Sequence, residues 1–431
     1  MPLRAPPQWR MTASPPKKPT RHLSASDLRA AAQLATQATH AITGMSEGVH
    51  QSVWRTLGAP NGATPAHTTG LTGLIYQSIH GVTGLIGRGL EAALTRLEPT
   101  LQRLEGQGDE SPERTAVIAA LNGVMGDRLQ ASANPLALPM TLHYQELPAF
   151  ISKGLEANLP LNVQLPGAGP KLLLVIHGLC MNDLQWTIGD PSQSVNHATT
   201  LAHELGYTPI YLRYNSGLHV SQNGHELARQ LQDLVQSWPT ALTQITVLAH
   251  SMGGLLIRSA LFYAQQVGLS WPALVKNIVF LGTPHHGAPL ERAGNWVDEL
   301  LGSTPYSRPF AKLGQLRSAG VTDLRYGHLL DVDWQGHDRF RRQPDSRQHV
   351  PLPEGIACFA VAATAAAQRG TLADRLLGDG LVPLPSALGQ HDKPARCLVF
   401  APAHQLVLYR THHLQLLSSP DVTRQLLQWL A

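Results

Sequence analysis

The sequence has few charged side chains. Asp, Glu, Lys and Arg together make up 14% of its 431 residues, whereas about a quarter is usual for a soluble domain. Hydrophobic residues make up 43%, which is enough for a sizeable core. The low charge density favours a surface that partly contacts lipid or another apolar partner. Nucleic-acid binding is not expected, because the net charge is only +4 and aromatic residues make up only 6% of the chain.

Cysteine is also scarce, and long apolar runs are missing. The three cysteines, Cys180, Cys358 and Cys397, lie far apart and form no CxxC pair. This pattern favours buried thiols in a reducing compartment, and the alternative is one disulfide plus a free thiol in an oxidising compartment. Because no stretch of 18 apolar residues exists, no membrane-spanning helix is expected.

Residues 1–22 carry basic side chains and prolines but no acidic residue and no apolar core segment. They are therefore expected to form a disordered basic tail rather than a cleavable secretory signal, with Met11 as an alternative start. The expected compartment is the cytoplasm, and peripheral association with a membrane remains open.

Residues 23–135 read as an all-helical N-terminal region. Apolar residues recur at spacings of three and four over 28–49 and 70–97, and a further helix is expected over 111–129. The helix expected over 70–97 contains many glycines, which favour close helix–helix approach. It is interpreted either as a packed helical hairpin or as a membrane-surface or oligomerisation element.

Residues 136–431 alternate short apolar runs with amphipathic segments. Strands are expected over 171–176, 208–212, 245–249, 277–281, 356–361 and 398–401. Buried strands that alternate with helices predict a mostly parallel sheet covered on both faces, so the fold class is α/β. Residues 288–352 interrupt the alternation, and a structureless loop of that length is uncommon. We therefore interpret this stretch as an inserted cap or lid.

The strongest chemical signal surrounds Ser251. An apolar strand runs into His250-Ser251, and Met252-Gly253-Gly254 opens a helix. A serine on such a sharp strand-to-helix turn projects its hydroxyl above the sheet and needs small neighbours two residues away on each side. Ala249 and Gly253 meet that need. This pattern predicts Ser251 as the nucleophile of an α/β hydrolase.

A second loop follows the strand over 171–176 and contains His177-Gly178-Leu179. In hydrolases of this kind the loop supplies one backbone N–H of the oxyanion hole, and the residue after the nucleophile supplies the other. We assign these two donors to Leu179 and Met252. His177 is interpreted as a packing or orienting residue of the loop rather than a catalytic group.

The nucleophile needs a base and an acid in the chain order serine, acid, histidine. Asp379 is the preferred acid because it lies in a loop between two glycines after the strand over 356–361. The competing acids are Asp331, Asp333, Asp374 and Asp392. His413 is the preferred base because it follows the last expected strand and precedes an apolar segment, and His412 is the alternative.

No metal or organic cofactor is expected, because the remaining histidines are not grouped at metal-ligand spacing. His285-His286, which follow another strand, could bind a metal, but the favoured interpretation is that their loop lines the active-site cleft.

Five segments together resemble bacterial triacylglycerol lipases and the related GPI inositol-deacylase-like branch of the α/β hydrolases. These segments are the 249–253 pentapeptide, the His177-Gly178 loop, residues 281–287, residues 379–383 and residues 413–417. The resemblance covers roughly residues 140–431 and does not reach the helical region. It implies hydrolysis of lipid-like or acyl esters through an acyl-enzyme intermediate, with a small-molecule or lipid ester as the substrate.

The same constellation fits other acyl-transfer enzymes, namely a thioesterase, an acyltransferase or an intracellular polyester depolymerase. A non-catalytic binding or membrane-tethering module is the remaining interpretation. It is disfavoured because such a module would be expected to have lost part of the triad, and the sequence contains a complete candidate set. Nothing in the sequence specifies the oligomeric state.

Overall fold

A computed structural model describes residues 30, 33, 112–144, 165, 167–186, 195–288, 317–339, 344–367 and 378–431. The chain divides into two compact units, Met1–Ser111 and Pro112–Ala431. The basic tail predicted over 1–22 and the helices predicted over 28–49 and 70–97 lie outside the described residues, apart from two isolated positions. The second unit contains the sheet and all of the candidate site.

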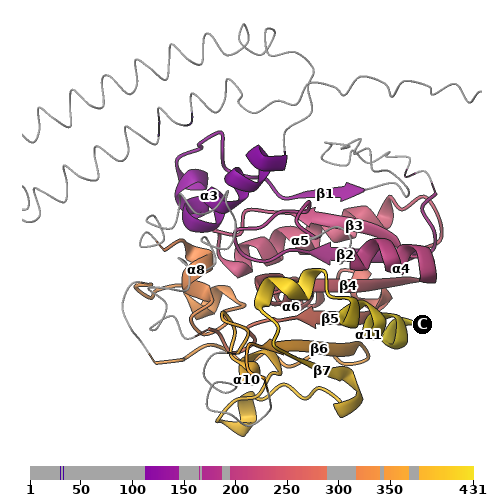
Figure 1. Cartoon of the computed structure of the whole chain (residues 1–431). Helices are drawn as coiled ribbons and strands as arrows, with labels where there is room; N and C mark the ends of the chain where they lie inside the picture. The colour runs from indigo at the N-terminus through magenta and orange to yellow at the C-terminus, as the bar shows by residue number, and fades with distance from the viewer. Residues whose placement is uncertain are drawn as a thin grey trace, which may run out of the picture. The chain divides into compact units, whose positions relative to one another are not determined.

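Seven strands form one sheet in the order β1-β3-β2-β4-β5-β6-β7, which is visible at the centre of Figure 1. The first strand pairs antiparallel with β3, and all other neighbours are parallel. The strands are β1 Thr141–Tyr144, β2 Lys171–Ile176, β3 Thr208–Arg213, β4 Gln244–His250, β5 Val275–Leu281, β6 Ala357–Thr364 and β7 Gln405–Tyr409. The expected mostly parallel sheet is therefore confirmed.

Helices cover both faces of this sheet, as the alternation of strands and helices predicted. Leu172 and Leu174 of β2 pack into a core shared with α5 (Val220–Gln236) and α6 (Met252–Gln266). Leu173 and Val175, which point the other way, pack with α4 (His197–Leu205) and α11 (Pro420–Leu430). Burial on both faces explains why β2 is a continuous apolar run rather than an alternating pattern. This is the α/β-hydrolase architecture (Figure 1).

The remaining described elements are short or lie outside the sheet. They are the helices α3 Pro112–Ala131, α8 Ala319–Asp323 and α10 Leu384–Ala387 and the 3-10 turns η1 Trp271–Leu274, η4 Asp331–Asp333, η5 Pro394–Arg396, η6 Pro402–His404 and η7 His413–Leu417. The helix expected over 111–129 corresponds to α3. The described part of the predicted cap, including α8 and η4, lies between β5 and β6, where the sequence placed the insert.

The strand predicted over 398–401 is wrong. Leu398 donates its N–H to the carbonyl of Gly389 instead of joining the sheet, and Val399 beside it is 87% exposed. Pro402 then starts a 3-10 turn, and the last strand begins only at Gln405. Strands β1 and β7 were not predicted. The edge strand β1 has only four residues, which gives a weak signal. The edge strand β7 contains the apolar run 406–409 although it is only half-buried, and residues 398–401 were chosen as the last strand in its place.

Helix α3 belongs to the same compact unit as the sheet. The boundary between the two units falls between Ser111 and Pro112, whereas the sequence placed a division near residue 135. Contacts with the sheet unit account for the difference, since the Asn215 side chain after β3 donates to the carbonyl of Gly126 in α3. No helix within the described ranges is long and apolar enough to cross a membrane.

One buried histidine ties α4 to the C-terminal elements. The ring of His197 contacts the Thr423 hydroxyl in α11 through Nδ1 and the Leu416 carbonyl through Nε2, each at 2.8 Å. Because a carbonyl can only accept, Nε2–H donates to Leu416 and Nδ1 accepts from Thr423 in the neutral ring. Burial lowers the pKa of His197 from 6.5 to about 4.

We expect the neutral His197 ring to make stability depend on pH. Between pH 6.5 and 4 the unfolded chain binds this proton and the folded chain does not, so stability falls as the pH falls through that window. The contribution lost is roughly 3 kcal/mol. Urea unfolding should show a steeper loss between about pH 7 and about pH 4.5 for the wild type than for His197→Gln, and parallel curves would contradict the assignment.

Candidate active site

Ser251 occupies a strained turn between β4 and α6. Its backbone has φ 54° and ψ −124°, in the region that side chains rarely adopt, and α6 begins at the next residue. The Ser251 N–H donates to the carbonyl of Leu281 at the end of β5, at 2.8 Å. Strain of this kind persists only where the surroundings fix it, and here the neighbouring strand does so. The strand–serine–helix turn expected from the sequence is present.

Three glycines let the neighbouring segments approach this turn closely. A methyl group on Gly253 would lie 2.7 Å from the carbonyl oxygens of Ile176 and His177, and one on Gly254 would lie 2.0 Å from Oγ1 of Thr283. A methyl on Gly178 would come within 3.0 Å of the Ser251 Cβ. The ends of β2 and β5 are therefore packed directly against the nucleophile turn. Of these three glycines, only Gly253 was predicted from the sequence to be required by the turn.

Asp379 and His413 are brought together although they lie far apart in the chain. Nδ1 of His413 and Oδ2 of Asp379 are 2.6 Å apart, and both side chains are buried. The other carboxylate oxygen, Oδ1, accepts the N–H groups of Leu381 and Val382 at 3.0 and 2.8 Å. The carboxylate is thus fixed in orientation, and Nδ1–H donation to it leaves Nε2 of His413 as the proton acceptor.

The base and the nucleophile turn both lie against the end of β5, at the carboxyl edge of the sheet. Gly282 directly follows β5, and a methyl group on it would lie 3.0 Å from Cε1 of His413. The preceding residue, Leu281, accepts the N–H of Ser251. The end of β5 therefore contacts both the serine turn and the imidazole.

The structure does not place the alternative base or the described competing acids in the Asp379–His413 pair. His412 is exposed, and Asp392 is exposed as well. Asp331 contacts His225 at 3.0 Å, while Asp333 accepts the backbone N–H groups of Leu329 and Leu330 in the insert. Asp374 lies outside the described residues.

His250 is a neighbour of the base that the sequence analysis did not single out. Its ring lies 4.6 Å from that of His413, and its Nε2 donates to the His413 carbonyl at 3.3 Å. Burial, reinforced by the His413 ring, holds the pKa of His250 well below 6.5. His250 therefore stays neutral beside the base. Its position directly before the nucleophile was the only sequence signal for this contact.

The candidate oxyanion loop follows β2. Leu179 and Met252 are both buried, and Cys180, next to Leu179, has a left-handed backbone with φ 61°. His177 stacks on Tyr214 at 4.4 Å, and the Tyr214 hydroxyl donates to the His177 carbonyl at 3.0 Å. Burial lowers the pKa of His177 to about 4. These contacts agree with the packing role that the sequence favoured for His177.

His285 and His286 are used in packing and hydrogen bonds. The buried His285 lies beside Phe280 and contacts Arg258. His286 accepts from Arg347 through Nδ1 and donates to the Gly389 carbonyl through Nε2. Both ring nitrogens of His286 are therefore engaged by protein groups. Within the described parts of the chain, no group of three or more His, Cys, Asp or Glu side chains is placed to hold a metal ion.

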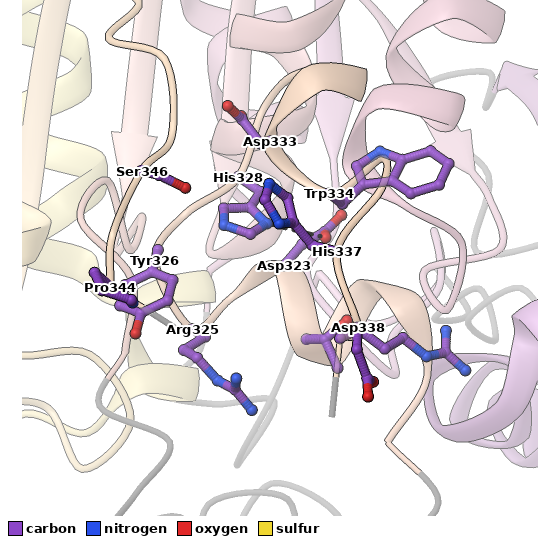
Figure 2. Close-up of a pocket in the computed structure, with 12 residues that line it drawn as sticks. Asp323, Arg325, Tyr326, His328, Asp333, Trp334, His337, Asp338, Pro344 and Ser346 are labelled. Carbon is purple, nitrogen blue, oxygen red and sulfur yellow. Dashed lines mark ion pairs between the residues drawn. The ribbon is translucent and has the colours of Figure 1, made fainter. Parts of the chain in front are cut away.

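A cavity opens within the insert. Its lining includes Asp323, Tyr326, His328, Trp334 and His337, and Figure 2 shows these side chains gathered around it. Asp323 is already bound to Nδ1 of His219 at 2.9 Å and to the N–H of Val220 at 2.8 Å. This carboxylate therefore holds the insert against the start of α5. None of Ser251, Asp379 and His413 lines the cavity.

We expect Asp379→Asn to change the tautomer of His413. The amide oxygen of the new side chain would keep the two backbone N–H donors, so its NH₂ group would face Nδ1 and favour the Nε2–H tautomer. Nitrogen NMR of ¹⁵N-histidine-labelled protein should show Nδ1 changing from a protonated to an unprotonated resonance. Asp392→Asn is the control, and an unchanged Nδ1 signal in Asp379→Asn would contradict the assigned geometry.

One family model and several solved structures are similar to parts of this chain. Residues 171–338 match the model of the PGAP1-like alpha/beta domain. No curated protein matches the sequence. Among solved structures, the mature lipase BlEst2 of Bacillus licheniformis is similar, with 19% identity, a TM-score of 0.41, and coverage of 63% of this chain and 96% of its own.

An inhibited esterase B from Lactobacillus rhamnosis shares 13% identity, with a TM-score of 0.34 and coverage of 72% of this chain and 94% of its own. An esterase of Pyrococcus furiosus also shares 13% identity, with a TM-score of 0.34 and coverage of 62% and 84%. By its own sheet order and serine turn, the described unit is an α/β hydrolase in architecture, and its residues 171–338 are similar to the PGAP1-like alpha/beta domain.

Proposed function

We propose that this protein is a serine hydrolase that cleaves carboxylic esters of lipid-like or acyl substrates through an acyl-enzyme intermediate. One observation carries the proposal: the strained Ser251 and the hydrogen-bonded Asp379–His413 pair are held at the same carboxyl edge of the sheet. The fold supports ester hydrolysis in general. The identity of the nucleophile and the substrate class are the specific parts of the proposal.

Acylation begins when Nε2 of His413 takes the proton of the Ser251 hydroxyl as Oγ attacks the ester carbonyl. The Asp379 carboxylate accepts the Nδ1–H bond throughout, so it fixes the tautomer and stabilises the imidazolium that forms. The carbonyl oxygen becomes an oxyanion, which the N–H groups of Leu179 and Met252 stabilise. Collapse of this intermediate breaks the ester C–O bond, and His413 gives its proton to the leaving alcohol.

Deacylation repeats the sequence with water. His413 removes a proton from a water molecule, which attacks the acyl carbonyl, and the proton returns to Ser251 as the acid product leaves. Because every proton moves between side chains of this chain, water and the substrate, the steps balance without a further co-reactant. The neutral His250 beside His413 adds no positive charge that would oppose formation of the imidazolium.

A thioesterase, an acyltransferase and a polyester depolymerase would use the same three residues and differ in leaving group or acceptor. An activity assay distinguishes these enzymes: a thioesterase would cleave added thioesters, and an acyltransferase would transfer the acyl group to an added alcohol. We propose a reducing, cytoplasmic location, because the three cysteines lie far apart in the sequence and form no CxxC pair.

We expect the wild-type protein to hydrolyse p-nitrophenyl esters, and a comparison from acetate to palmitate will define its preferred acyl length. Ser251→Ala should lower kcat by roughly 10⁴-fold or more, because the covalent route is lost. Ser270→Ala, at an exposed serine, is the matched control and should keep the wild-type rate. A folded wild-type protein that is inactive on every ester and thioester would overturn the proposal.

A further inference from the structure

Helix α3 lies directly against the candidate oxyanion loop. A methyl group on Gly123 would lie 2.2 Å from Sγ of Cys180 and 2.8 Å from its Cα and backbone nitrogen. Only glycine therefore allows this approach, because α3 lies against the backbone of Cys180 as well as against its side chain. Leu179, the proposed donor, is the residue before Cys180.

A buried hydroxyl holds the same turn from another side. The N–H of Cys180 donates to Oγ of Ser216 at 3.1 Å, and Ser216 lies in the loop after β3. Cys180 adopts φ 61° without being glycine, so its conformation depends on such surrounding contacts. The peptide between Leu179 and Cys180 is thus fixed by Ser216 and covered by α3.

Helix α8 of the insert contacts α3, the loop of Ser216 and the side chain of Met252. The N–H of Met252 is the other proposed oxyanion donor. The Ser318 hydroxyl, which caps α8, donates to the Gly123 carbonyl at 2.6 Å. A methyl group on Gly320 would lie 2.1 Å from the Ser216 carbonyl oxygen and 3.1 Å from Cε of Met252. Gly123, Cys180, Ser216, Ser318 and Gly320 thus form one packed junction, which we call the α3 junction.

We propose that α3, through Gly123, and the Ser216 hydroxyl are positioning elements that hold the Leu179–Cys180 turn in the geometry of the oxyanion hole. This inference rests on the proposed function. It assigns a catalytic consequence to a helix that lies before the sheet, outside the residues 171–338 that match the PGAP1-like domain. Neither Gly123 nor Ser216 touches the substrate in this proposal, so both act through the amide of Leu179.

The expected loss of rate on displacing the Leu179–Cys180 turn is large, because stabilisation of the oxyanion depends steeply on the position of its donors. A donor must lie within hydrogen-bonding distance of the oxyanion that develops in the transition state. A displacement of about 1 Å costs on the order of 10²-fold in rate. A methyl group on Gly123 forces a displacement of the turn or of α3, because contacts of 2.2 and 2.8 Å are too short to persist.

The test compares Gly123→Ala with the wild type in ester hydrolysis. We expect kcat to fall on the order of 10²-fold with little change in KM. The inhibition constant of a trifluoromethyl ketone, whose adduct with Ser251 carries an oxyanion, should rise by about the same factor as kcat/KM falls. The pH profile of kcat/KM should keep its midpoint, because the Asp379–His413 pair is not altered.

Two further variants separate positioning from stability. Ala119→Gly weakens the same helix at a buried position but adds no group near Cys180. It should lower the melting temperature and leave the kcat of the folded protein unchanged. Ser216→Ala removes the acceptor for the Cys180 N–H without adding atoms, so it remains informative if Gly123→Ala does not fold. We expect a loss of roughly tenfold in kcat for Ser216→Ala.

The outcomes separate this inference from the proposed function. If the wild type is active, Ser251→Ala is inactive, and both Gly123→Ala and Ser216→Ala are folded with wild-type kcat and inhibitor affinity, then only the inference is overturned. An equal loss of kcat in Ala119→Gly would also overturn it, because general loosening of α3 would then explain the effect. Failure of the proposed function would instead show in a wild type that lacks activity.

Discussion

The left-handed backbone of Ser251 is the constraint on which the rest of the site depends. It exists because the Ser251 N–H is bound to the end of β5 and because Gly178, Gly253 and Gly254 let the ends of β2 and β5 close around the turn. A side chain at any of these glycines would meet another group at 3.0 Å or less. The apolar parallel strands are therefore the scaffold that maintains a local conformation which the chain would not adopt alone.

The same edge of the sheet orders the acid and the base. Asp379 lies in the connection after β6 and contacts His413 through Oδ2, while its Oδ1 accepts hydrogen bonds from two backbone N–H groups. His413 begins η7 after β7, and the neutral His250 ring lies next to it. The serine turn and the imidazole both contact the end of β5, and the carboxylate is held by its own loop and by His413. Precise placement of this kind is what a proton relay between a serine and an imidazole requires.

The sequence predicted most of the scaffold because its signals are local. The buried strands β2 to β6 are apolar runs, and the serine turn has a steric signature within five residues. The edge strand β1 has only four residues and lacks such a run. The edge strand β7 contains the apolar run 406–409, but Leu398 and Phe400, which are buried outside the sheet, form an apolar pattern shortly before it and were misread as the last strand. The assignments of Ser251, Asp379, His413, Leu179 and Met252 remain predictions about function, although the structure brings Asp379 and His413 into hydrogen-bonding contact.

The long-range contacts could not be read from the sequence. Nothing near Gly123 indicates that its missing side chain matters to Cys180, because the two come together only when α3 folds onto the sheet unit. The pairing of Ser216 with Cys180 and of His250 with His413 has the same origin. Such contacts depend on the tertiary arrangement of segments, whereas periodicity reports only on the segment in which it occurs.

The most direct test of the central claim is covalent labelling of the folded protein with a fluorophosphonate, followed by peptide mapping. We predict a single modified site at Ser251, with labelling lost on unfolding and slowed strongly in His413→Ala, because only an activated serine reacts. Labelling at another serine, or none at Ser251 in folded protein, would contradict it.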